Sequence, residues 1–316
     1  MLPIGSLEAV PDIARRAEDQ GIDGVWTAEA AHDAFLPLAL AAEHTSRLSL
    51  GTGIAVGFAR TPMTLAVVAN DLQLLSKGRV ILGLGSQIRP HIEKRYSMPW
   101  SRPADRMREM VLALRAIWDC WYEGTPLAFR GEFYTHTLMT PMFSPGPNPY
   151  GAPKVYVAGV GERMTRVAGE VADGFLVHPF TSPRYLRERI LPVLDEGLAL
   201  GGRTRADIEI GFPGFVVDGD NRKSVEAARA QMAFYGSTPA YHPVLELHGW
   251  LDLGLELNRV SKSDAPDKWQ QMAALVPDEV VREVAVWTTP DNVRSAVSDV
   301  YDGVIDRFTL SPSFIT

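Results

Sequence analysis

Short apolar runs alternate with longer amphipathic segments along most of the chain. Nearly continuous apolar runs separated by segments of helical period are typical of a parallel sheet covered by helices. The expected strands occupy residues 23–28, 48–56, 79–85, 154–160, 174–179, 208–219 and 306–312. The expected helices occupy residues 7–21, 37–46, 62–78, 104–124, 162–174, 183–200 and 223–236.

A strand is missing from this pattern at the N-terminus. A closed (β/α)8 TIM barrel has eight strands, whereas the pattern supplies seven, and only "MLPI" precedes the first helix. Either residues 1–5 form a shortened first strand, or the natural start lies upstream of this sequence. We therefore expect an α/β chain that folds as one TIM-barrel domain over residues 1–316, with a truncated first strand.

Two segments interrupt the alternation. Residues 124–150 are expected to form a short hairpin followed by a Pro- and Gly-rich excursion, and residues 236–277 separate the last expected helix from the last strand. Long insertions in a compact domain are usually lids or interface elements. Their apolar content favours a bulky, fairly nonpolar substrate or, alternatively, a homodimer interface.

Composition narrows the classes of partner and compartment. The chain has 46% hydrophobic and 22% charged residues and a net charge of −7, which argues against general attraction to nucleic acid or an anionic membrane. Its one cysteine, Cys120, excludes an internal disulfide framework and fits a reducing cytoplasm. The apolar stretches are too short to span a bilayer.

The loop after the first expected strand carries a carboxylate and an imidazole. Glu29 and His32 stand three residues apart, next to Asp33, and strand ends are where barrels gather their chemistry. Such a pair is suited to proton transfer near neutral pH. The alternative is that Asp33 or Glu29 only caps the next helix. The pair is too sparse to form a metal site.

The end of the strand at 48–56 has an irregular pattern. Gly53, Ile54 and Ala55 break its alternation, which predicts a bulge that could back a flat ring. An ordinary glycine-bearing bulge is the alternative.

The loop after the strand at 79–85 concentrates hydrogen-bonding and basic groups. Gly83 and Gly85 are followed by Ser86 and Gln87, whose side chains form hydrogen bonds. The basic residues that follow are Arg89, His91, Lys94 and Arg95. They favour an anionic ligand tail, although a charged loop is often only solvated.

Two further strand ends are candidates. Gly159 and Gly161 bracket a helix start whose main-chain N–H groups, up to Met164, would suit a phosphate. The glycine spacing is not that of a dinucleotide site, and a plain tight turn is the alternative. His178 ends another strand and would face the barrel mouth, unless it is a core histidine.

Taken in order, these segments resemble the luciferase-like monooxygenase superfamily, specifically its coenzyme F420-dependent oxidoreductase branch. The resemblance runs from "PDIARRAEDQGIDGVWTAEAAHD" through "LSLGTGIAVGFARTP" and "GRVILGLGSQIRPHIEKR" to "KVYVAGVGERMTRVAGEVADGFLVHPF". It implies a TIM barrel with a flavin or deazaflavin at its C-terminal mouth and, commonly, a homodimer. FMN in place of F420, or a non-catalytic flavin-binding relative, are the alternatives.

The resemblance also implies roles for individual residues. It places a cis peptide at Gly53–Ile54 against one face of the ring, and it makes Glu29 or His32 the acid/base for hydride transfer between deazaflavin C5 and substrate. Phe35 stands in the loop where several relatives have tryptophan and, with His178, is expected to contact substrate. The resemblance assigns contacts with the ring edge or side chain of the cofactor to Gly85, Ser86 and Gln87. It assigns contacts with the cofactor phosphate to Gly159, Val160, Gly161 and Met164.

Overall fold

Parallel strands alternate with helices in the first of two units into which the chain divides in the computed structural model. This unit comprises residues 1–159, 163–176 and 195–208, and the second comprises residues 160–162, 177–194 and those from 209 onward. The structure describes residues 1–2 and 6–310. Most of the expected shortened first strand lies outside the described residues, but the Leu2 N–H donates to the Trp26 carbonyl at 2.8 Å.

The strands of the first unit follow one another in sheet order. They are β1 Gly24–Thr27, β2 Ser49–Thr52, β4 Val80–Gly85, β7 Lys154–Gly159 and β8 Gly174–Val177. The pairs β1–β2, β2–β4 and β4–β7 are parallel, and the two-residue strand β3 Ala55–Val56 also pairs with β4. Parallel pairing brings the carboxyl ends of these strands to one edge, as the sequence pattern predicts.

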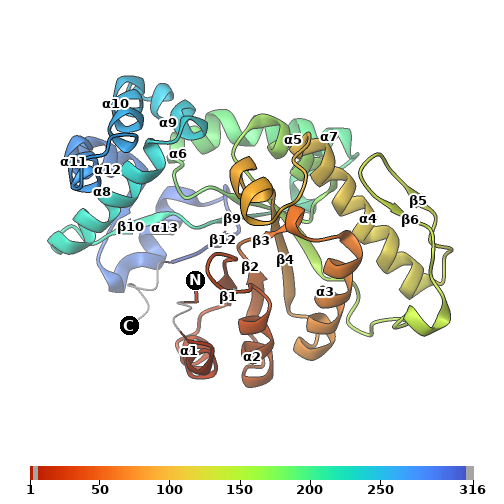
Figure 1. Cartoon of the computed structure of the whole chain (residues 1–316). Coiled ribbons are helices and arrows are strands. Elements are labelled where there is room, and N and C mark those ends of the chain that lie inside the picture. The colour runs from red at the N-terminus through yellow and green to blue at the C-terminus, as the bar shows by residue number, and fades with distance from the viewer. Residues whose placement is uncertain (3–5, 311–316) are drawn as a thin grey trace. The chain divides into compact units, whose positions relative to one another are not determined.

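Helices alternate with these strands, and the first four pack on one another in order. They are α1 Val10–Asp19, α2 Leu36–His44, α3 Pro62–Ser76, α4 Pro103–Glu123 and α5 Glu162–Val171. Contacts join α1 to α2, α2 to α3 and α3 to α4 (Figure 1). Helix α3 begins at a capping box in which Thr61 and Thr64 satisfy each other's main-chain N–H groups. The bounds of these helices lie within one or two residues of the expected ones, with two exceptions. Helix α1 starts three residues late, after a 3-10 turn, and α5 ends three residues early.

The first insertion contains the expected hairpin. Strands β5 Phe129–Arg130 and β6 Thr135–His136 pair in antiparallel fashion. The chain then runs through the exposed side chains of Leu138, Met142 and Phe143. The described chain therefore leaves these apolar side chains largely exposed.

The second unit contains two pairs of short parallel strands. Strand β9 Glu209–Phe212 pairs with β12 Arg307–Phe308, and β10 Phe215–Val217 pairs with β11 Ala285–Trp287. The expectation of one strand over residues 208–219 is therefore wrong. The chain breaks at Pro213, which lacks an N–H, and at Gly214, where a Cβ would lie 2.6 Å from the Phe212 ring. The sequence pattern also missed β11.

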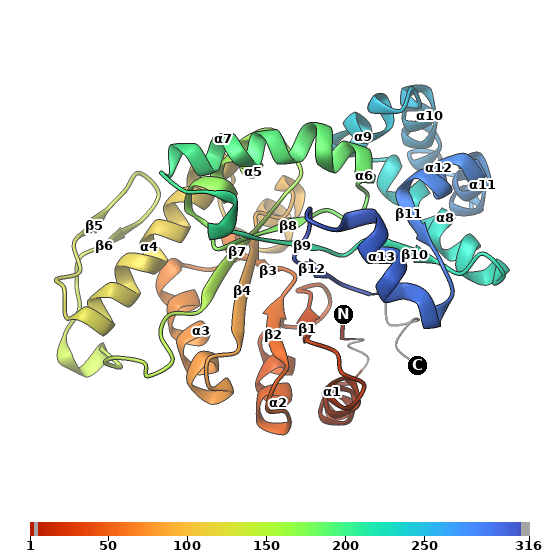
Figure 2. The same ribbon diagram turned by 180° about the vertical axis from the view of Figure 1, so that it is seen from behind.

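The second insertion is helical, which the sequence pattern did not predict. The helices of the second unit are α6 Pro183–Tyr185, α8 Arg222–Gly236, α9 His242–Leu247, α10 Leu251–Ser261, α11 Lys268–Leu275, α12 Asp278–Val284 and α13 Val293–Tyr301. Helix α7 Leu191–Leu200 contains residues of both units. Helix α8 packs against α10, α11 and α12 (Figure 2), and the buried side chains of Met232, Leu257, Met272 and Val281 share one hydrophobic cluster. None of the helices among the described residues has the length and apolar character needed to cross a membrane.

Candidate active site

The backbone bends sharply where β2 ends. The peptide bond between Gly53 and Ile54 is cis, as the resemblance implies, and it separates β2 from β3. The Gly53 N–H donates to the Thr27 carbonyl at 2.6 Å, and the Ile54 carbonyl accepts from the Glu29 N–H at 3.0 Å. The bend is thus held to the end of β1 by main-chain hydrogen bonds on both sides.

The last residue of β4 must be small because of this bend. A Cβ on Gly85 would lie 2.8 Å from Cδ1 of Ile54, closer than a side chain could approach without displacing its neighbour. Gly85 therefore leaves room for the Ile54 side chain.

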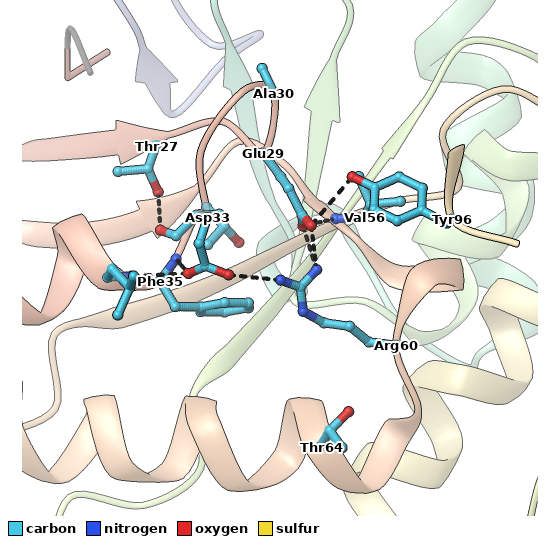
Figure 3. Close-up of polar contacts among 12 residues, drawn as sticks. Thr27, Glu29, Ala30, Asp33, Phe35, Val56, Arg60, Thr64 and Tyr96 are labelled. Carbon is cyan, nitrogen blue, oxygen red and sulfur yellow. Dashed lines mark hydrogen bonds and ion pairs between the residues drawn. The ribbon is translucent and has the colours of Figure 1, made fainter. Parts of the chain in front are cut away.

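Glu29 is the centre of a polar network at this edge (Figure 3). Its carboxylate accepts from the Val56 N–H at 2.8 Å and from Nη1 of Arg60 at 2.5 and 2.6 Å. The Tyr96 hydroxyl lies 3.4 Å from the same group. The Glu29 side chain is 8% exposed, so a charge-assisted pair stabilises a largely buried carboxylate.

Arg60 joins Glu29 to a second acid. Its Nη2 donates to Asp33 at 2.9 Å, and its guanidinium carbon lies 5.2 Å from the centre of the buried Phe35 ring. The other oxygen of Asp33 accepts from the N–H groups of Phe35 and Leu36 at 2.7 and 3.1 Å. Asp33 thus accepts the N–H groups that lead into α2, although the N-cap residue of that helix is Phe35.

Tyr96 and Arg95 extend the network from the loop after β4. Burial, and then the charge of Glu29, raise the pKa of Tyr96, so its hydroxyl keeps its proton and donates to Glu29. The Arg95 guanidinium donates to the Ala30 carbonyl and lies 5.0 Å from the centre of the Tyr96 ring. Arg60 and Tyr96 were not predicted as site residues. One signal in the sequence could have indicated Arg60. It follows the expected strand at 48–56, and the loop after the neighbouring strand carries the acids Glu29 and Asp33.

The predicted pair of Glu29 and His32 is not a hydrogen-bonded pair. No hydrogen bond joins them among the residues that the structure describes, and His32 is exposed whereas Glu29 is partly buried. The two groups therefore offer different chemistry. Glu29 accepts hydrogen bonds from within the protein, and the His32 imidazole faces solvent.

Ser86 and Gln87 use their side chains inside their own turn. The Ser86 hydroxyl donates to the Gln87 carbonyl at 3.1 Å, and the Gln87 side chain accepts from the Ile88 N–H at 3.0 Å. Gln87 has a φ of 59°, in the left-handed region. In the basic run that follows, Arg89 pairs with Glu93 at 3.0 Å on the surface. The Ser86 and Gln87 side chains are thus bonded within the turn, and part of the predicted positive charge is already paired.

The predicted phosphate turn lies where β7 ends and α5 begins. A Cβ on Gly159 would lie 2.8 Å from Cγ of Met164, a buried side chain that fills the space left by the glycine. A Cβ on Gly161 would meet no heavy atom within 4 Å. Together with Val160, these residues lead into the first main-chain N–H groups of α5, which begins at Glu162. Such an end is favourable for an anion.

His178 lies in the second unit among aromatic rings. It follows β8, its Nδ1 accepts from the Phe180 N–H at 3.1 Å, and its ring stacks on Tyr241 at 4.1 Å between centroids. Tyr235 meets the same ring edge-on at 4.7 Å. Burial lowers the pKa of His178 to about 3, so this imidazole is neutral at physiological pH.

A second histidine of that unit resembles part of a hydrolase triad. Nε2 of His248 lies 2.8 Å from the Ser182 hydroxyl, and its Nδ1 lies 3.8 Å from Glu283. Ser182 is 0% exposed, however, and it accepts the Tyr185 N–H at the start of α6. A nucleophile must reach its substrate, so this arrangement is a helix cap and not a catalytic triad.

Comparison with known proteins identifies the family of this chain. The model of the luciferase-like monooxygenases matches residues 2–307. An uncharacterized protein of Mycobacterium tuberculosis is 56% identical over 95% of this chain and 89% of its own length. A putative coenzyme F420-dependent oxidoreductase of the same organism is 31% identical over 91% of this chain and 86% of its own length.

Solved structures give the same fold. The coenzyme F420-dependent tetrahydromethanopterin reductase of Methanopyrus kandleri, a TIM-barrel protein, superposes with a TM-score of 0.80 over 100% of this chain and 94% of its own, at 21% identity. The oxygenating constituent of 3,6-diketocamphane monooxygenase of Pseudomonas putida, in complex with FMN, has a TM-score of 0.65 over 98% and 88%, at 18% identity. The expected TIM-barrel fold is confirmed, and the chain belongs to the luciferase-like monooxygenase family.

Proposed function

We propose that this protein is a coenzyme F420-dependent oxidoreductase that transfers a hydride between the deazaflavin and an organic substrate. The observation that carries the proposal is the glycine-rich carboxyl end of β4, where the Ile54 side chain lies against Gly85. A strand end without side chains of its own, next to an apolar neighbour, suits the face of a flat ring. The relative described as a putative F420-dependent oxidoreductase supports this choice of cofactor.

The described residues fit such a group. Gly53, Ile54 and Gly85 would lie against the ring, and Ser86 and Gln87 beside its edge or side chain. The open position at Gly161 and the start of α5 suit a phosphate, which Gly159, Val160, Gly161 and Met164 would surround. When bound, the deazaflavin supplies the carbon that gives or receives the hydride.

We assign the proton transfer that accompanies hydride transfer to Glu29 or His32. The geometry favours His32 as the proton donor. A proton on Glu29 would remove the charge that holds Arg60 and would compete with the Val56 N–H. Glu29 then orients the loop after β1, whereas the exposed His32 exchanges protons with solvent and substrate.

Cofactor titration tests the proposal. Oxidised F420 and FMN are added separately to the purified protein, and binding is followed by cofactor fluorescence. We expect saturable binding of F420 at micromolar concentration and much weaker binding of FMN. Binding of neither cofactor at millimolar excess would contradict the proposal.

Two variants assign the proton step. Glu29→Gln and His32→Ala are compared with the unmodified protein in single-turnover hydride transfer, with F420 affinity measured in parallel. We expect His32→Ala to slow the proton-dependent step by about 100-fold, with F420 affinity retained. If neither variant slows turnover, neither residue is the acid/base.

An FMN-dependent monooxygenase is the second candidate, supported by the similarity to the FMN-containing monooxygenase structure. A deazaflavin lacks the ring nitrogen needed for ready oxygen activation, so the two cofactors give different products. Incubation with reduced FMN, oxygen and a panel of aldehydes and alkanes distinguishes them. Oxygenated product would favour the monooxygenase, and F420 binding without turnover on any substrate would favour a non-catalytic relative.

We further propose that the protein acts in the cytoplasm as a homodimer on a small-molecule substrate, with neither nucleic acid nor membrane as a partner. The exposed Leu138, Met142 and Phe143 in the first insertion support the dimer, since clustered exposed apolar side chains are typical of interfaces. In light scattering after gel filtration, Met142→Ser with Phe143→Ser is expected to convert dimer to monomer. The control Leu200→Ser, at another exposed leucine, should leave the dimer intact.

A further inference from the structure

The aromatic cluster around His178 has hydrogen-bond donors that face no acceptor in the described part of the chain. The cluster consists of His178, Tyr235 and Tyr241, with Phe180 and Phe215 against it. Tyr235 lies 5.9 Å from Tyr241 between ring centroids. Among residues 1–2 and 6–310, neither tyrosine hydroxyl nor Nε2 of His178 forms a hydrogen bond, and none of these three atoms belongs to the fully buried polar atoms that lack a partner. The hydroxyls of Tyr235 and Tyr241 and Nε2 of His178 can therefore form hydrogen bonds with a ligand.

The tautomer of His178 follows from its contacts. Nδ1 accepts the Phe180 N–H, so it carries no proton. Burial favours the neutral ring, and a neutral ring with a bare Nδ1 has its hydrogen on Nε2. His178 is therefore a hydrogen-bond donor through Nε2 and is poorly suited to acid/base chemistry.

The two tyrosines share this character. Burial raises the pKa of Tyr235, and it raises the pKa of Tyr241 to about 12, so both hydroxyls stay protonated. Burial causes the pKa shifts of Tyr235 and His178, and burial together with the neighbouring Tyr235 causes that of Tyr241, with no charged side chain of the described chain among the causes. The cluster thus combines aromatic surface with neutral donors.

We propose that His178, Tyr235 and Tyr241 form a subsite for an uncharged part of the organic substrate that carries a hydrogen-bond acceptor oxygen, such as a carbonyl beside an apolar or aromatic group. His178 follows a parallel strand at its carboxyl end, where TIM barrels bind ligands. The stacked rings bury the apolar group, and the Nε2–H donates to the oxygen. The proposal rests on the proposed function, because it defines the substrate class of that enzyme.

Binding of two matched probes tests the subsite without any cofactor. Acetophenone carries a carbonyl oxygen, whereas ethylbenzene has nearly the same shape without an acceptor. We expect acetophenone to bind more tightly, and His178→Phe to weaken acetophenone by about three- to tenfold, the worth of one neutral hydrogen bond, with ethylbenzene unchanged. Tyr150→Phe, in the first insertion, is the control and should change neither probe.

A second variant and a spectroscopic measurement keep the test independent of folding. His178→Gln retains both a side-chain acceptor and a donor, so it should recover most of the acetophenone affinity. Nitrogen NMR of the histidine rings should show Nε2 protonated and Nδ1 unprotonated between pH 5 and pH 8. A proton on Nδ1, equal affinity for both probes, or preference for the cation trimethylanilinium would each overturn the proposal. Since F420 titration is a separate measurement, its failure would be distinguishable from failure of the subsite.

Discussion

The Glu29 network of the first unit and the His178 cluster of the second hold their side chains by opposite means. Arg60 bridges Glu29 and Asp33 through charge-assisted hydrogen bonds of 2.5–2.9 Å. The His178 cluster contains neutral rings in one stacked and two edge-on contacts, with centroids 4.1–5.9 Å apart. The first arrangement fixes loop positions by electrostatics, and the second fixes ring positions by packing and burial.

This difference predicts different responses to mutation and pH. A buried ion pair is costly when one partner is removed, because the remaining charge is left uncompensated. A neutral aromatic cluster loses only packing and single hydrogen bonds, but its histidine must stay unprotonated. Each arrangement can therefore be probed by a change that the other would tolerate.

The largest effect is expected from removing the cation of the Glu29 network. Arg60→Met leaves the Glu29 carboxylate, 8% exposed, and Asp33 without their shared partner, so we expect the free energy of unfolding to fall by about 3 kcal/mol. The measurement is urea unfolding followed by circular dichroism.

Arg89→Met is the matched control for this change. Arg89 pairs with Glu93 on the surface at 3.0 Å, and an exposed pair of this kind contributes less than about 1 kcal/mol. Equal losses in the two variants would show that the Glu29 network is no more than a surface ion pair.

A smaller effect is expected from acid on the His178 cluster. The folded-state pKa of about 3 lies below the unfolded value near 6.5, so the unfolded chain takes up the proton first. This contribution is complete above about pH 6.5 and is lost as pH falls toward 3, by up to about 1.4 kcal/mol per pH unit. His178→Gln should flatten the decline measured by urea unfolding from pH 7 to pH 4. An unchanged slope would mean that His178 titrates normally in the folded protein.

The smallest effect is expected from the Tyr96 hydroxyl. Its contact with Glu29 is 3.4 Å long, and Arg60 and the Val56 N–H already satisfy the carboxylate. Tyr96→Phe should therefore reduce the free energy of unfolding by less than about 1 kcal/mol. A loss as large as that of Arg60→Met would show that Tyr96, rather than Arg60, holds Glu29 in place.

The sequence by itself determined the alternation of strands and helices, because apolar runs and helical periodicity are local properties. It located β1, β4 and β7 within one residue, and its single expected strand at 48–56 covers both β2 and β3. The cis peptide at Gly53–Ile54 followed from the motif that carries the family resemblance. It did not locate β11 or the split at Pro213–Gly214, because strands of three residues gain their definition from the partner they pair with.

Only the tertiary structure decided which polar groups meet. Arg60 lies 31 residues from Glu29 along the chain, and no local pattern pairs them until parallel strands bring their loops together. The same holds for His178, whose neutrality depends on burial and whose ring contacts, Tyr235 and Tyr241, lie more than fifty residues away in sequence. Residue type specifies which groups can ionise, but burial and neighbouring charge decide whether they do so, and both depend on contacts made only in the folded chain.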